Sequence, residues 1–93
     1  MQKYVGLRFK REDDKGIYTV WFLGSSERLM REDLASREEW KDFIKRPDVE
    51  SEVLSEDQIR KETSYAFEAA AKNFRGGAQW TGDRTFSKIK VKQ

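Results

Sequence analysis

The chain has 93 residues, enough for one domain with a small core, which its six Phe, three Trp and three Tyr residues can fill. It has neither cysteine nor histidine, which excludes a disulfide framework, a thiolate zinc site, a cysteine nucleophile and a histidine general base. No apolar run approaches the roughly 20 residues that a membrane-spanning helix needs. The net charge is only +2, which by itself indicates no particular partner. From these properties we expect a single domain over residues 1–93 that is soluble and cytoplasmic. We also expect that it needs no cofactor or metal and that it acts by binding rather than by catalysis.

The amino-terminal region predicts a β-hairpin. Val5, Leu7 and Phe9 would point to one face and Tyr4, Arg8 and Lys10 to the other, which is the period-two pattern of a half-buried strand. Residues 13–16, Asp-Asp-Lys-Gly, are typical of a turn, because Asp satisfies local backbone groups and Gly accepts a positive φ. Residues 17–23 are rich in β-branched and aromatic types and predict the second strand. This strand is apolar on both faces, so either both faces of the sheet are covered or one of them exposes aromatic side chains to a partner.

The next segment, residues 27–33, fits two structures. Gly24 and the two serines that follow it end the second strand. Leu29 and Met30 would lie on opposite faces of a third strand in a meander. Alternatively, Ser25 or Ser26 could cap a short helix. Of the two, we predict the strand.

A first helix is predicted after residue 36. Ser36 and Glu39 have the spacing of a capping box, with Ser36 as the N-cap residue. Pro47 ends the helix, because the residue before a proline avoids the helical conformation. Three residues would form its apolar face: Trp40, Phe43 and Ile44.

A longer helix follows, beginning with a second capping box at residues 55–58 and ending at Gly76-Gly77. Its apolar side recurs at helical spacing through Ile59, Thr63, Ala66, Phe67, Ala70 and Phe74. Residues 85–92 alternate again and predict a closing strand that pairs beside the first strand. The order β-β-(β)-α-α-β therefore predicts an α+β domain, in which a small antiparallel sheet (the hairpin or a three-stranded meander, plus the carboxyl-terminal strand) packs against two helices.

Charge is segregated along the chain, since residues 27–58 carry six bases and eleven acids whereas residues 72–93 carry six bases and one acid. If the first and last strands pair, they would form a basic face with aromatic rings: Tyr4, Arg8, Lys10, Phe86, Lys88, Lys90 and Lys92. Such a face would suit nucleic acid, with cations on phosphates and rings stacked on bases. The alternative is an ordinary solvent-facing surface whose lysines protect the sheet edge.

Two further segments are candidates for contact with a protein. The first, residues 75–84, is rich in glycine and offers the Arg and Trp side chains that are common in interface hot spots: Arg75, Gln79, Trp80 and Arg84. The second, residues 48–57, could present the carboxylates of Asp48, Glu50 and Glu52 to a basic groove. The simpler alternatives are that Trp80 folds back over the end of the helix and that the acidic stretch is merely solvated.

No phosphate-binding loop or catalytic motif is present, so we expect a non-enzymatic adaptor or inhibitor that contacts a larger protein or nucleoprotein. Roles of this kind are frequent among phage and mobile-element accessory proteins. The alternative is a nucleic-acid-binding domain that uses the basic strand face. A membrane partner is not expected. A homodimer is possible, because a second strand that is apolar on both faces could expose one face to another copy of the chain.

Overall fold

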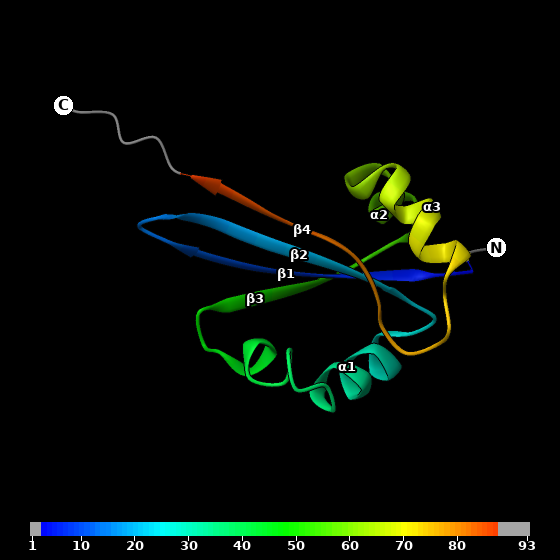
Figure 1. The fold of residues 1–93 in the computed structure, drawn as a ribbon, viewed down its shortest axis with the longest axis horizontal. Coiled ribbons are helices and arrows are strands. Elements are labelled where there is room, and N and C mark those ends of the chain that lie inside the picture. Colours follow the sequence, from blue (N-terminus) through cyan, green and yellow to red (C-terminus); the bar gives the residue numbers. More distant parts are fainter. Residues whose placement is uncertain (1–2, 88–93) are drawn as a thin grey trace.

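The computed structural model describes residues 3–87, which form a four-stranded antiparallel sheet in the order β3-β1-β2-β4 with helices on both faces (Figure 1). The strands are β1 (Val5–Asp13), β2 (Gly16–Gly24), β3 (Val49–Leu54) and β4 (Gln79–Ser87). The helices are α1 (Glu27–Ala35), a short 3-10 helix η1 (Phe43–Lys45), α2 (Glu56–Thr63) and α3 (Tyr65–Lys72). The predicted α+β class, with an antiparallel sheet packed on helices, is confirmed. Within residues 3–87, no helix is both long and apolar enough to cross a membrane.

The predicted hairpin is confirmed. β1 and β2 pair antiparallel from Val5 opposite Gly24 to Asp13 opposite Gly16. The Asp13 carboxylate closes the turn by accepting hydrogen bonds from the backbone N–H groups of Lys15, at 2.8 Å, and Gly16, at 3.1 Å. Gly16 has a φ of 155°, which a residue with a side chain rarely adopts. The turn therefore uses the residue types from which it was predicted.

The predicted third strand at residues 27–33 is wrong, because this segment is the helix α1. The Ser26 hydroxyl caps the helix by accepting a hydrogen bond from the backbone N–H of Leu29 at 3.2 Å. Met30 and Leu34, four residues apart, are both fully buried, as expected for one face of a helix. The alternative of a short helix capped by Ser26 is thus the one that forms.

The helix predicted after residue 36 is also wrong in extent, since residues 38–42 form turns and only Phe43–Lys45 is helical. Ser36 does not begin a helix. It is the C-cap of α1, and its hydroxyl donates a hydrogen bond to the Asp33 carbonyl at 2.7 Å. The predicted apolar residues nevertheless cover the sheet: the Trp40 ring lies 5.1 Å from Phe22, edge to face.

An unpredicted strand, β3, occupies the edge of the sheet beside β1. It includes most of the acidic stretch, residues 48–57, for which no strand was predicted. Glu50 lies opposite Lys10 and Glu52 opposite Arg8, so opposite charges face each other across the two strands. The last strand therefore pairs with β2 and not with β1, which corrects the predicted topology. β4 begins at Gln79, earlier than predicted, and residues 88–92 lie outside the described part of the chain.

The long second helix is predicted at the correct place but is divided in two. Its capping box is confirmed, because the Ser55 hydroxyl accepts a hydrogen bond from the Gln58 backbone N–H at 3.2 Å. At Ser64 the backbone has φ 54° and ψ −128°, and the chain turns there between α2 and α3. This conformation is almost restricted to glycine.

We expect Ser64→Gly to raise the free energy of unfolding by about 1 kcal/mol, measured by urea denaturation. A side chain in this region costs about 1–3 kcal/mol, part of which is offset by the larger conformational freedom of glycine in the unfolded chain. Ser55→Ala is the informative contrast, because it removes a cap and should lower the free energy of unfolding by about 1 kcal/mol. Destabilisation by Ser64→Gly would show that the turn is not strained.

The sheet separates two hydrophobic cores. One lies between the sheet and α1 with η1, and comprises Leu7, Phe9, Val20, Phe22, Met30, Leu34 and Ala78. The other lies between the opposite face and the α2–α3 pair, and comprises Trp21, Leu23, Leu54, Ile59, Phe67 and Ala70. Both faces of β2 are thus covered, which is one of the two outcomes expected from its apolar sequence (Figure 1).

Candidate functional site

The segment 75–84 connects α3 to β4 and then forms most of β4. Gly76 and Gly77 have φ values of 98° and 69°, so the chain reverses through conformations that favour glycine. The loop is fixed to α1 because the Asp33 carboxylate accepts a hydrogen bond from the Ala78 backbone N–H at 3.0 Å. The same carboxylate oxygen binds Arg37 at 2.9 Å. The residue just before β4 is therefore held by α1, which packs on the face of the sheet opposite to α3.

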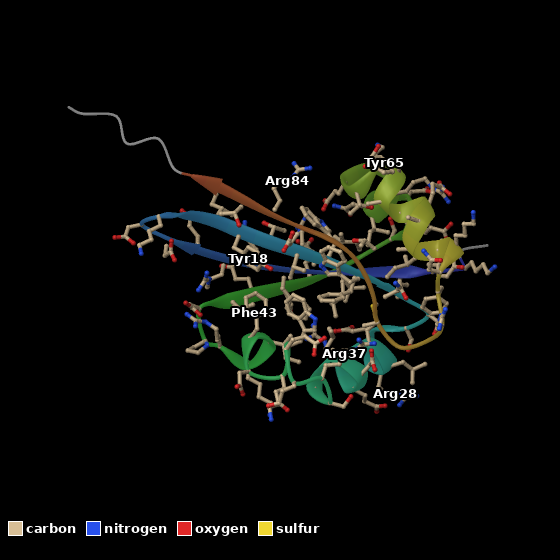
Figure 2. The ribbon with its side chains drawn as sticks, in the orientation of Figure 1. Tyr18, Arg28, Arg37, Phe43, Tyr65 and Arg84 are labelled. Carbon is tan, nitrogen blue, oxygen red and sulfur yellow. The ribbon has the colours of Figure 1, made fainter. Side chains whose placement is uncertain are left out.

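A groove of about 400 Å³ runs between α3 and β4, and we call it the α3–β4 groove. Its lining is uncharged: Tyr65, Ala66, Ala69, Ala70, Asn73, Gln79, Trp80 and Thr81. Tyr65 is 84% exposed and Trp80 is 50% exposed. Figure 2 shows Tyr65 on the outer side of α3. The small alanines beside Tyr65 leave space that another molecule could fill. Trp80 stands opposite Phe22, which belongs to the core under α1, so strand alternation directs its ring toward the α1 face.

The predicted protein-binding residues of segment 75–84 are only partly brought together at this groove. Gln79 and Trp80 line it. Arg75 is exposed in the loop before β4. Arg84 lies further along β4, with its guanidinium 5.7 Å from the ring centre of Trp21. Tyr65, which also lines the groove, was not predicted, although a tyrosine on the polar side of the predicted helix could have indicated it.

The acidic candidates lie at the far edge of the sheet, with β1 and β2 between them and β4. Asp48 forms two hydrogen bonds with Arg46, at 2.8 and 2.7 Å, and these hold the pKa of its carboxyl below the ordinary value. Glu52 forms an ion pair with Arg8. Glu50 stands opposite Lys10 in the strand register. The acidic stretch is therefore largely neutralised by cations of the same chain.

The residues of the predicted basic face are separated in the structure. β2 lies between β1 and β4, and Phe86 stands opposite Ile17 of β2. Tyr4 packs edge to face on Phe67 and Phe74, at ring distances of 6.1 and 5.4 Å. Lys88, Lys90 and Lys92 lie outside the described residues. Within residues 3–87, β4 pairs with β2 and not with β1, so the strand pairing from which this basic strip was predicted is absent there.

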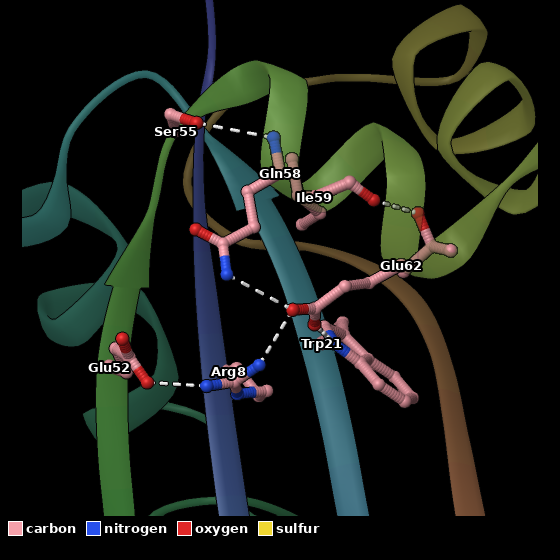
Figure 3. Close-up of polar contacts among 8 residues, drawn as sticks. Arg8, Trp21, Glu52, Ser55, Gln58, Ile59 and Glu62 are labelled. Carbon is pink, nitrogen blue, oxygen red and sulfur yellow. Dashed lines mark hydrogen bonds and ion pairs between the residues drawn. The ribbon is translucent and has the colours of Figure 1, made fainter.

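Arg8 belongs instead to a polar network that joins α2 to the sheet (Figure 3). Glu62 accepts hydrogen bonds from Arg8 and from the indole N–H of Trp21, both at 2.7 Å, and a longer one from Gln58 at 3.3 Å. Burial alone would raise the pKa of Glu62, but the bonds from Trp21 and Arg8 outweigh it and the pKa lies below its ordinary value. The network holds α2 against the sheet. Within it, the Arg8 guanidinium forms ion pairs with two carboxylates, Glu52 and Glu62.

We expect Glu62→Gln to lower the free energy of unfolding by about 1–2 kcal/mol at pH 7, because the charge-assisted bonds to Arg8 and Trp21 are weakened. A carboxylate with a depressed pKa stabilises the fold fully above its unfolded pKa of about 4.3, and this contribution is lost as pH falls through the folded value. The difference between wild type and variant should therefore shrink below about pH 4. Urea denaturation between pH 3 and about pH 7 measures it, and a difference independent of pH would contradict the role of the charge.

Comparisons with known proteins identify no relative of this chain: no protein family matches it, and no curated protein or solved structure is significantly similar to it.

Proposed function

We propose that this protein acts by binding another protein through the α3–β4 groove, and that it is not an enzyme. The observation that supports this most directly is the 84% exposure of Tyr65 beside a groove lined with alanine. Trp80, 50% exposed, borders the groove on β4, and its register opposite Phe22 directs its ring toward the α1 face, where it extends the exposed aromatic surface around β4. Aromatic side chains are enriched at protein interfaces and supply much of their binding energy. They bury a large area and lose little conformational entropy, so a partner gains from covering them.

A protein partner is favoured over nucleic acid for this groove because its lining carries no charge. Nucleic-acid binding depends on cations that neutralise phosphates. On the sheet face where those cations were predicted, Arg8 is bound by two carboxylates and Lys10 stands opposite Glu50. A nucleic acid would have to displace these acids, whereas a protein can bind the groove as it stands.

A pull-down from nuclease-treated extract of the native host tests the proposal. The double variant Tyr65→Ala with Trp80→Ala should weaken capture of the partner by about 30-fold or more, since each hot-spot side chain contributes at least about 1–2 kcal/mol. The matched control is Leu29→Ala with Val53→Ala, which removes exposed apolar side chains on α1 and β3 (39% and 43% exposed) and should leave capture unchanged.

The nucleic-acid alternative predicts a different result. Oligonucleotide binding would fall steeply with salt, with a log–log slope of about −0.7 to −0.9 per phosphate contacted. Reversing the charges of Lys88, Lys90 and Lys92 would abolish it, and the groove variants would not. Salt-sensitive oligonucleotide binding together with a pull-down that recovers no protein would overturn the proposed function.

A further inference from the structure

The outer edge of β4 is open for pairing. β4 is an outer strand of the sheet and pairs only with β2 (Figure 1). Within residues 3–87, no backbone–backbone hydrogen bond joins residues 79–87 to any segment other than β2. An outer strand presents a row of unpaired N–H and C=O groups along its free side, and these groups can bind an extended peptide as an additional strand.

An exposed aromatic side chain lies on each face of the sheet beside this edge. The ring of Trp80 is on the α1 face, because its partner in the register, Phe22, belongs to the core under α1. Tyr65 is on the opposite face, where it lines the α3–β4 groove. Successive side chains of an added strand point to opposite faces. One extended segment along β4 would therefore cover Trp80 with one set of side chains and fill the groove with the other set.

The charges of β4 favour a segment without net charge. The only charged side chains among residues 79–87 are Asp83 and Arg84, whose charges cancel. Asp83 accepts a hydrogen bond from the Tyr18 hydroxyl at 3.3 Å, and the Arg84 guanidinium lies 5.7 Å from the ring centre of Trp21. Both charges thus already contact groups of the same chain. Because the groove lining is also uncharged, apolar or uncharged polar side chains of a partner match this surface best.

The opposite outer strand is less suited to bind such a segment. β3 is shorter, with six residues against nine in β4. It carries Glu50 and Glu52, and charged side chains protect a sheet edge from pairing. The Arg31 guanidinium also reaches from α1 to β3, where it donates a hydrogen bond to the Ser51 hydroxyl at 2.9 Å. The edge of β4 is therefore the better site for strand addition.

A second copy of the chain fits this edge less well than a separate segment. Two β4 strands that pair antiparallel about a two-fold axis place the residue on the axis opposite itself. A pairing centred on Asp83 or on Arg84 therefore sets like charges opposite each other, which is destabilising. A centre at Gly82 would set the register irregularity of β4 against itself, and a centre nearer Ser87 moves the axis away from Trp80 and the groove. A separate segment has none of these restrictions.

We propose that the partner supplies an extended segment without net charge, which pairs with the outer edge of β4 as a fifth strand, fills the α3–β4 groove on one face and covers Trp80 on the other. The inference rests on the proposed function, because it assumes that the groove and Trp80 bind protein. It names the conformation and the charge of the segment that is bound.

Selection of short random peptides displayed on phage tests the inference, with the purified full chain as bait. The affinity of a synthetic selected peptide is then measured for the wild type, Tyr65→Ala and Trp80→Ala. We expect at least about fivefold weaker binding to each variant. The matched control, Val53→Ala, removes an exposed apolar side chain from the other outer strand and should leave the affinity unchanged. Raising the salt concentration from about 0.05 to 0.5 M should change the affinity by less than about threefold, because no net charge is involved.

The peptide itself reports whether it binds as a strand. The N–H groups of an outer strand point alternately toward its neighbour and away from it. Methylation of a backbone nitrogen should therefore weaken binding at least about tenfold at every second position and be tolerated at the positions between. Alanine scanning of the peptide against both protein variants measures which side chains are coupled. Those coupled to Tyr65 should recur at every second position, and those coupled to Trp80 at the positions between.

The outcomes separate this inference from the proposed function. Peptides that depend on Tyr65 and Trp80 but tolerate methylation at every backbone position, or that bind with a steep salt dependence, would overturn the added uncharged strand and leave the protein-binding groove standing. Recovery of no peptide that depends on these residues would overturn the inference, whereas the pull-down decides the proposed function separately. Concentration-dependent dimerisation in sedimentation experiments, abolished by Trp80→Ala, would identify a second copy as the occupant and overturn the partner segment.

Discussion

Phe67→Ala should lower the free energy of unfolding by about 3–5 kcal/mol, a large share of the roughly 5–15 kcal/mol that stabilises a domain of this size. The Phe67 ring is buried in the core between α3 and the sheet. Tyr4 packs against its edge, and the Arg60 guanidinium lies 4.2 Å from its centre. Truncation removes these contacts and leaves a cavity in the core, and both losses lower the stability.

Tyr65→Ala is the matched control for this prediction. It removes an aromatic ring two residues away on the same helix, but that ring is exposed and its loss should change stability by no more than about 0.5 kcal/mol. Urea denaturation followed by fluorescence and by circular dichroism measures both variants. Equal costs for Phe67→Ala and Tyr65→Ala would show that α3 does not pack on the sheet as described.

Gly24→Ala should cost about 1–3 kcal/mol, because there is no room for a methyl group at the end of β2. A Cβ atom at Gly24 would lie 2.3 Å from Cγ of Met30 and 2.7 Å from the backbone oxygen of Gly77. Met30 can adjust its side chain, but the oxygen of Gly77 can move only with the loop. The loop leads directly into β4, so we expect displacement there to reach Trp80 and to weaken partner binding as well.

Gly6→Ala separates the two parts of this effect. The three atoms nearest to a Cβ atom at Gly6 would all belong to the side chain of Ile59, the closest at 2.6 Å, on the α2 side of the sheet. It should therefore destabilise the protein through packing and leave the loop before β4 in place. Amide chemical shifts of residues 75–80 should change in Gly24→Ala and not in Gly6→Ala. Unchanged shifts in both variants would contradict the proposed coupling between Gly24 and the groove.

The elements predicted correctly are those whose signals are local. The hairpin follows from period-two alternation and from the turn residues at 13–16, and the start of α2 follows from the serine cap at Ser55. β3 could not be predicted in this way. Its glutamates resemble a solvated loop until the fold places them opposite Lys10 and Arg8, some 40 residues earlier in the chain.

Of the residues that line the α3–β4 groove, the sequence indicated those on β4 but not those on α3. Trp80 and Gln79 stand out in a glycine-rich segment with few other large side chains, and both line the groove. Tyr65 was missed although it lies on the polar side of the predicted helix, and its place at the start of α3 depends on the turn at Ser64, which was not predicted. The groove itself is a tertiary feature, since it requires β4 to return beside α3.

The alternation of side chains along β2 has a consequence for how the molecule denatures. Val20 and Phe22 belong to the core under α1, whereas Trp21 and Leu23 belong to the core under α2 and α3. Neither helical layer can detach without exposing one side of this central strand to water, so the two layers should melt together. A single two-state transition, with equal calorimetric and van't Hoff enthalpies and with the β2 amides last to exchange their hydrogens, is the behaviour that this arrangement imposes.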